Sequence, residues 1–236
     1  MIAYTVNSSP PISTESVSDF VARNNRLANF PKLADYNNNK KQIPFCPVTA
    51  YNSTEDWSAM LDEARNLRDM FVPHRSGEHH LGWESLTLHG LSSVHTGSSV
   101  GYGYENFGPH NRWTDVSDFT PTIRSFVKSL NFPTMGRVRI MKLRAHGYIA
   151  VHHDGHYGIG AINIALNNPI NCNFYIDGCG ILPFHNKDNE NFPRIILPNI
   201  GYYHAVINNS DEDRYHIIIH AEKTRAWERI ENESIT

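Results

Sequence analysis

The sequence predicts a mainly β protein with flanking helices, of the α+β class, whose core is a double-stranded β-helix, a jelly roll of the cupin type. After Gly136 the chain is made of short runs rich in β-branched and aromatic residues, separated by turns rich in Gly, Asn, Asp and Pro. Before that point, two helical patterns can brace the outside of one sheet. The predicted strands of the core span residues 137–143, 148–154, 161–166, 171–177, 194–197 and 215–221.

Two helices are predicted in the first half of the chain. The first opens at Ser53, which is followed by acidic residues and then by apolar residues at helical spacing, and it is expected to end at Pro73. The second starts at Thr120 and Pro121, and Pro133 follows its end.

The length of 236 residues favours one domain. Residues 1–80 are expected to form a helical and irregular N-terminal support, 81–222 the jelly-roll core and 223–236 a tail. Within the core, residues 81–88 alternate like a strand. Residues 95–113 are rich in Gly and aromatic residues without clear periodicity, which predicts a long loop of the kind that often carries function.

Composition excludes several classes of partner. The net charge is −3 and the pI is about 6.5, so no basic footprint for nucleic acid or for a membrane surface is expected. We find no apolar run long enough for a membrane span and no signal-peptide pattern. The three cysteines include no CxxC motif, which favours a reducing cytoplasm, with Cys172 and Cys179 as packed thiols rather than a disulfide.

The sequence V-H-H-D-G-H at residues 151–156 indicates a metal site. Residues i and i+2 of a strand point to the same face, so His152 and Asp154 are expected to present an imidazole and a carboxylate side by side. His204, from a distant strand, can complete a set of two histidines and one carboxylate. This facial triad leaves coordination positions open and is the usual seat of non-haem Fe(II) in oxygenases.

Other interpretations of these histidines stay open. His153 is expected on the opposite face of the strand, packed or in solvent. His152 and His156 also have the H-x3-H spacing of a zinc-binding helix, although Gly155 and Gly158 disfavour a helix there. The chain has fourteen histidines, so the triad residues can also be unrelated core and surface side chains.

Arg214 adds a second kind of chemistry to the metal site. It begins the last predicted strand, and a turn that brings this strand antiparallel to the one ending at His204 is expected to place it in the metal cavity. A guanidinium there can clamp a carboxylate in bidentate fashion, as a dicarboxylic co-substrate chelated to iron would require. The alternative is a surface salt bridge with a neighbouring acid: Asp211, Glu212 or Asp213.

These motifs together resemble the Fe(II)/2-oxoglutarate-dependent dioxygenases, in particular the aspartyl/asparaginyl β-hydroxylase-like group that includes proline hydroxylases. The resemblance spans roughly residues 80–222. It rests on the segments 83–88, 136–143, 152–154, 204–209 and 213–216.

The resemblance implies iron on the triad and 2-oxoglutarate that chelates the iron and binds Arg214. O2 then drives oxidation of the substrate together with decarboxylation of 2-oxoglutarate to succinate and CO2. The resemblance also puts Trp83 among the candidate cofactor-binding residues. The chain departs from the family at His146-Gly147, where Pro-Gly is usual, and at Ala161 and Asn163, where some members carry an Arg and a His. Asn163 is therefore the candidate for the second 2-oxoglutarate contact.

The expected substrate is an amino-acid-like molecule, free or within a peptide, lying over the open face of the iron. The aromatic loop residues Tyr102, Tyr104 and Phe107 can cover it, and the candidate anchors for a substrate carboxylate are Arg112, Arg139 and His89. Two alternatives remain at this point: a non-catalytic cupin-like binding module and a zinc-dependent hydrolase that uses the same ligands.

Overall fold

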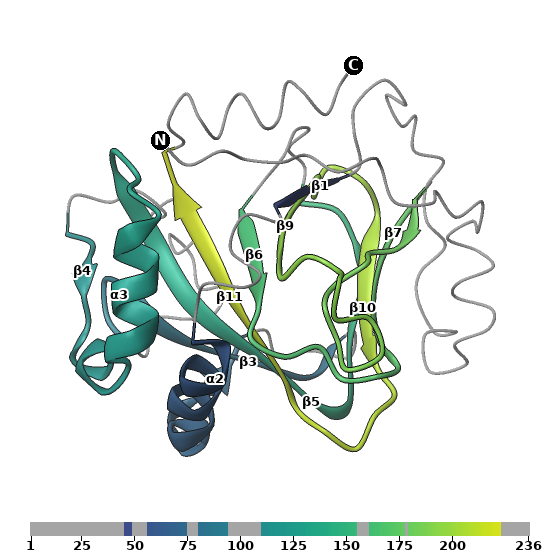
Figure 1. Ribbon diagram of the computed structural model, residues 1–236, viewed down its shortest axis with the longest axis horizontal. Helices are drawn as coiled ribbons and strands as arrows, with labels where there is room; N and C mark the ends of the chain where they lie inside the picture. Colours follow the sequence, from purple (N-terminus) through teal and green to yellow (C-terminus); the bar gives the residue numbers. More distant parts are fainter. Residues whose placement is uncertain are drawn as a thin grey trace.

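The structure, a computed structural model, describes residues 45–48, 56–74, 80–93, 110–154, 161–177 and 179–222. This part of the chain is mainly β, and its antiparallel strands form one curled sheet of the jelly-roll type (Figure 1), which confirms the predicted class. The strands are β1 Phe45–Val48, β2 Val72–Pro73, β3 His80–Gly90, β4 Arg112–Trp113, β5 Met135–His152, β6 Ile162–Ala165, β7 Cys172–Ile176, β8 Gly180–Ile181, β9 Ile195–Pro198, β10 His204–Asn208 and β11 Arg214–Ala221.

The long strand β5 organises the sheet. The strand order is β1-β9-β6-β11-β5-β10-β7-β8, and β3 lies along the other edge of β5. The first half of β5 pairs with β11 and its second half with β10, so β10 and β11 follow one another along the same edge. We expected β11 to pair with the strand of His204, and this was wrong: β10 begins at His204, and both strands take β5 as partner.

A bend in β5 carries the chain from one half of the sheet to the other. The sequence predicted two strands separated by a turn at residues 145–147, but the structure has one strand of 18 residues through this point. His146 adopts φ +58°. A Cβ at Gly147 would lie 2.7 Å from the carbonyl oxygen of Leu81 and 2.8 Å from that of Arg144, so only glycine fits the bend.

Helices α2 (Trp57–Asn66) and α3 (Pro121–Ser129) brace the outer face of the sheet, as predicted. The Trp57 ring meets the Phe126 ring edge-on, with centroids 5.3 Å apart, and both belong to the larger apolar core cluster. The α2 helix ends at Asn66 instead of Pro73, because a short 3₁₀ helix, Arg68–Met70, follows it. The N-cap of α2 is Asp56; Ser53 lies outside the described residues. A second 3₁₀ helix, Asp115–Phe119, precedes α3.

The alternation of side chains on β11 separates this outer core from the interior of the barrel. Tyr215, Ile217 and Ile219 belong to the cluster packed under the helices. Arg214 and His216 have the opposite parity and point into the space between the two halves of the sheet. A second apolar cluster fills that space and joins residues of both halves, among them Ala165, Phe174, Ile196 and Val206.

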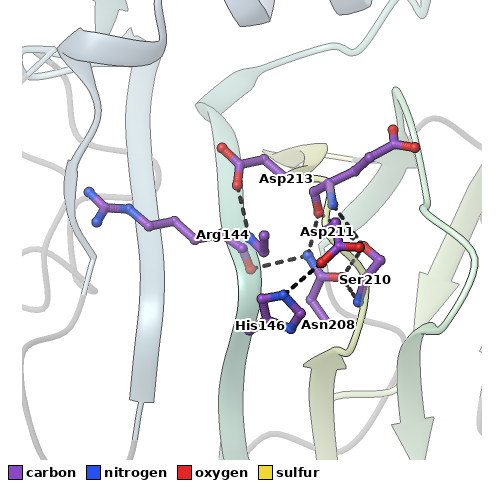
Figure 2. A network of polar contacts seen from close by, with 8 residues as sticks. Arg144, His146, Asn208, Ser210, Asp211 and Asp213 are labelled. Carbon is purple, nitrogen blue, oxygen red and sulfur yellow. Dashed lines mark hydrogen bonds and ion pairs between the residues drawn. The ribbon is translucent and has the colours of Figure 1, made fainter.

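Polar contacts fix the turn between β10 and β11 against the bend in β5 (Figure 2). The side-chain amide of Asn208 donates to the carbonyl oxygens of Leu143, Arg144 and Glu212, at 3.3, 3.1 and 2.7 Å. Asp213 accepts from the Ala145 backbone N–H at 2.8 Å. The turn that leads into Arg214 is therefore held in one place.

Residues 1–44 and 223–236 lie outside the described residues, so the predicted division into support, core and tail stays a prediction. Strand β1, within the first 80 residues, pairs with β9 and so extends the sheet. Cys172 and Cys179 are buried thiols, as expected. Within the described ranges, no helix is long and apolar enough to cross a membrane.

Candidate metal centre and anion site

The predicted triad comes together at one end of the barrel. Ligand atoms of His152, Asp154 and His204 all lie within 4.8 Å of one another. His152 ends β5 and is the register partner of His204 at the start of β10. Asp154 follows just after β5, and its backbone N–H donates to the carbonyl oxygen of Ile200 at 3.0 Å. Strand pairing places the two histidines, and this backbone bond brings the carboxylate beside them.

Backbone hydrogen bonds fix the tautomer of both histidines. Nδ1 of His152 lies 2.6 Å from the carbonyl oxygen of Ala150, and Nδ1 of His204 lies 2.9 Å from that of Tyr202. A carbonyl oxygen can only accept, so both Nδ1 atoms carry the proton. Each Nε2 then presents a lone pair that can bind a metal, and the hydrogen bonds of Nδ1 hold the rings in orientation.

The electrostatics of the site favour a neutral His204 imidazole. The pKa of His204 is lowered to about 4, mainly by burial and in part by the neighbouring His152, while Asp154 opposes the shift. The two imidazole centroids are 4.3 Å apart, and His152 Nε2 lies 3.8 Å from an Asp154 oxygen. Two nitrogen donors and one oxygen donor at one end of the barrel fit a divalent transition metal.

Among the described residues, the adjacent His153 is not part of this cluster. His153 is exposed, and its ring meets the Tyr203 ring at 5.2 Å, in agreement with its predicted position on the other side of the strand. His156 and the glycines of the alternative zinc motif at residues 155 and 158 lie outside the described residues.

Arg214 is buried inside the barrel, with 3% of its surface exposed. The alternative of a surface salt bridge is not what the structure shows: Asp211 binds His146, Glu212 lies near Arg65 and Lys187, and Asp213 binds a backbone N–H. In the described part of the chain, no carboxylate forms an ion pair with Arg214, and its Nε has no hydrogen-bond partner. Burial lowers the pKa of Arg214 to about 10, so the guanidinium stays charged at neutral pH.

A buried cation without a counter-charge costs several kcal/mol, and an anionic ligand removes that cost. The ring of Phe174 contacts both this cation and the metal ligand His204. Arg214 Cζ lies 6.0 Å from the Phe174 centroid, and the His204 centroid lies 5.9 Å from it. The residues present therefore fit a metal ion and, beside it, a ligand that carries a carboxylate.

The other two predicted cofactor contacts lie on the same inner face. Trp83 and Arg214 are both register partners of Leu143, on its two sides, and the Trp83 ring lies 6.3 Å from that of His152. The Asn163 Oδ1 lies 2.7 Å from Nδ1 of His216, the imidazole that also contacts Arg214.

The three residues predicted to anchor a substrate carboxylate lie in different environments. Arg112 is exposed on β4, and His89 is buried with its Nδ1 bonded to the carbonyl oxygen of Gly136. Arg139 lies on the inner face, and its Nη1 is 3.3 Å from Nε2 of His74. Tyr102, Tyr104 and Phe107 lie outside the described residues.

The sequence interpretation missed four residues around the site: His74, His80, Phe174 and His216. His74 and His80 lie edge-on to the Trp83 ring at 4.3 and 5.1 Å. His216 could have been found from the sequence, because it stands two positions after Arg214 on the same strand face.

A separate cavity of about 290 Å³ opens beside β7 and β8. Its lining includes Cys172 and Phe184 but none of the triad residues, so it is not the metal site.

No model of a known protein family matches the sequence, and no curated protein matches it. Solved structures similar to this chain include a prolyl hydroxylase from Trichoplax adhaerens in complex with a hypoxia inducible factor peptide, at 14% identity and a TM-score of 0.48, covering 81% of this chain and 87% of that one. A Pseudomonas putida prolyl-4-hydroxylase is similar at 8% identity and a TM-score of 0.36, covering 71% of this chain and 86% of that one. A 2OG-Fe(II) oxygenase family protein from Burkholderia pseudomallei is similar at 13% identity and a TM-score of 0.37, covering 70% and 94%.

These similar structures bear the names of the class that the sequence motifs resemble. Similarity at these identities and TM-scores assigns neither an activity nor a substrate to this chain.

Proposed function

We propose that this protein is an Fe(II)/2-oxoglutarate-dependent dioxygenase that hydroxylates an amino-acid-like substrate, free or within a peptide. One observation carries the proposal. Arg214 is buried in the barrel without a carboxylate partner among the described residues, and it contacts the same Phe174 ring as His204, one of the two histidines that cluster with a carboxylate. A metal site alone fits many activities. A metal site beside a carboxylate clamp fits a keto acid with a second carboxylate.

In this proposal His152, Asp154 and His204 hold the iron, which when bound supplies the site for O2 and for the keto-acid end of 2-oxoglutarate. Arg214 binds the distal carboxylate of the co-substrate by charge-assisted hydrogen bonds. Phe174 and the surrounding apolar cluster exclude water, which strengthens those bonds. The protein thus contributes orientation and a dry environment around the chemistry.

The substrate side of the proposal rests on the residues around Trp83. The rings of His74, His80 and Trp83 pack edge-on beside the metal ligand His152, and the His80 and His152 centroids are 5.9 Å apart. Arg139 contacts His74 at the far end of this row. An amino-acid side chain over the rings, with its carboxylate toward Arg139, matches this arrangement of aromatic and cationic groups.

The test is conversion of 2-oxoglutarate to succinate by the Fe(II)-loaded protein, with mass spectrometry of amino acids and peptides for a gain of one oxygen. We expect turnover in air, none without O2, and none in the variant His152→Ala. The control is His185→Gln, a histidine outside the triad that accepts from Arg194.

Turnover that survives His152→Ala would contradict the assignment. Hydrolysis that persists without O2 in a zinc-loaded protein would instead support a zinc-dependent hydrolase. A protein that binds 2-oxoglutarate and oxidises nothing in the screen would support a non-catalytic binding module.

A further inference from the structure

The cavity of about 290 Å³ beside β7 and β8 has an apolar floor and an apolar rim. The buried side chains of Leu182 and Phe184 belong to its floor. Three of the six large apolar side chains that are exposed in the described part of the chain belong to its rim: Ile170, Ile181 and Phe192. Exposed apolar side chains that gather around a cavity indicate a binding site, whereas scattered ones do not.

The polar groups of the cavity suit a peptide backbone and a basic side chain. Asn171 and Asn173, at the start of β7, line the cavity, and neither side-chain amide forms a hydrogen bond within the described ranges. An amide offers donors and an acceptor, which together match a peptide group. Asp188 is the one charged side chain among the described lining residues. It is exposed and has no ion pair in that part of the chain, so it favours a cationic group on the ligand.

Strand β8 provides an open sheet edge beside the cavity. It ends the strand order, and among the described strands it pairs only with β7. The N–H of Leu182 donates to the carbonyl oxygen of Phe174 at 2.7 Å. Because backbone groups of successive residues alternate between the two sides of a strand, the N–H and C=O of Ile181 point away from β7. An extended peptide can therefore add to this edge by main-chain hydrogen bonds and place a side chain in the cavity.

We infer that β8 and this cavity form a docking site for an extended peptide segment of a partner protein. An apolar side chain of the peptide enters the cavity over Phe184, and its main chain pairs with Ile181. A basic side chain two positions away lies on the same face of the extended peptide and meets Asp188. The inference does not rest on the proposed function, because no triad residue lines the cavity.

The probe is the peptide acetyl-Ala-Lys-Ala-Leu-Ala-Lys-Ala-amide. Its leucine has a lysine two positions away in both directions, so binding does not depend on the direction of the peptide. The measurement is an NMR titration of the ¹⁵N-labelled protein, with and without Zn(II). We expect the amide signals of Asn171, Asn173 and Ile181 to shift to saturation, with a dissociation constant of roughly 1 mM or lower that is equal with and without metal.

Two altered probes test the two modes of contact while the protein stays unchanged. Alanine in place of the leucine should weaken binding roughly 10-fold, because the cavity loses its apolar occupant. N-methylation of the leucine nitrogen keeps the side chain but removes a main-chain donor, and it should weaken binding roughly 3- to 10-fold. An apolar patch without strand pairing would bind the N-methylated probe as well as the original.

Two exposed positions of the protein test the charge and the rim. Asp188→Lys should weaken binding of the lysine probe roughly 3- to 10-fold and should favour a probe with glutamate in place of both lysines. Its matched control is Asp69→Lys, an exposed acid that does not line the cavity. Phe192→Ser should weaken binding of every probe that keeps the leucine, and its control is Phe119→Ser, an exposed phenylalanine before α3.

Three results would overturn the inference. The first is an absence of saturable shifts at Asn171, Asn173 and Ile181 with excess probe. The second is equal affinity for the original probe and for either altered probe. The third is a dimer of the protein in light scattering that Ile181→Pro converts to a monomer, because the edge would then join two copies of this chain.

Discussion

Arg214 and His204 contact the same ring, that of Phe174, with Arg214 Cζ at 6.0 Å and the His204 centroid at 5.9 Å. The cation comes from β11 and the metal ligand from β10, two strands that follow one another along β5. We therefore expect a small molecule that extends from the metal along Phe174 to reach Arg214.

Replacement of Arg214 by Met should have opposite effects on binding and on stability. Loss of one partner of a buried charge pair costs about 2–5 kcal/mol of binding free energy, so 2-oxoglutarate affinity should fall roughly 30-fold or more. The ligand-free variant should melt at a higher temperature than the wild type, because an uncompensated buried charge is gone. Calorimetry and thermal unfolding measure the two effects.

The control for that variant is Arg194→Met. Arg194 donates to the carbonyl oxygens of Ala165 and Leu166, so its removal leaves buried acceptors unsatisfied and should lower the melting temperature. A decrease of equal size in both variants would show that Arg214 is stabilised in some other way.

The adjacent histidines should differ in metal binding. His152→Gln should abolish tight Fe(II) or Zn(II) binding, because a triad that loses one ligand keeps only two. His153→Gln should leave metal affinity within about threefold of the wild type, since His153 packs on Tyr203 outside the cluster. Metal content after dialysis measures both; strong loss in His153→Gln would contradict the identity of the triad.

The sequence predicted the mainly β class and most of the central strands, but not how the strands continue and pair. Period-2 alternation separated His152 from His153. Arg214 is buried inside the barrel, but not through the predicted pairing of its strand with that of His204. It could not show that β5 continues through His146, because a bend with positive φ has the same residues as a turn. Nor could it show that β10 and β11 share β5 as a partner, since pairing between distant strands leaves no local signal. Phe174 was missed because it meets Arg214 and His204 only through the fold, and no residue near it in the sequence indicates a metal or anion site.

Stability should fall in acid partly because of His216. Burial keeps the pKa of the folded His216 well below 6.5, whereas the unfolded histidine titrates near 6.5. Below that pH the unfolded state binds more protons, so the free energy of unfolding should fall by up to about 1.4 kcal/mol per pH unit as the pH decreases. Urea unfolding between pH 7.5 and 5.5 should show a shallower decrease for His216→Gln than for the wild type; identical slopes would contradict this.

Breaking the buried ion pair of Glu84 and Lys142 should lower the free energy of unfolding strongly. The two side chains are each 7% exposed and 2.7 Å apart, and Arg144 also binds Glu84. Glu84→Gln leaves the Lys142 ammonium buried without its counter-charge, so we expect a loss of about 3–5 kcal/mol in the free energy of unfolding.

Denaturant titration of Asp118→Asn provides the comparison for Glu84→Gln. Asp118 binds Arg124 at 2.6 Å, but its side chain is 75% exposed. Its loss should change stability by no more than about 1 kcal/mol. Similar effects of the two substitutions would mean that the Glu84 pair is solvated in solution.

Asn208 should be the residue on which the position of Arg214 depends most. It is fully buried, and its amide nitrogen donates to three carbonyl oxygens of the bend and the turn (Figure 2). Asn208→Ala should cost about 1–3 kcal/mol, because buried carbonyls lose their donor. Asn208→Asp should cost more, since it directs a carboxylate at the same oxygens.

The neighbouring Asn209 is exposed, so Asn209→Asp should change neither the melting temperature nor the 2-oxoglutarate affinity, both of which should fall in the Asn208 variants. If Asn208→Ala unfolds like the wild type and binds 2-oxoglutarate equally well, the turn does not depend on this network.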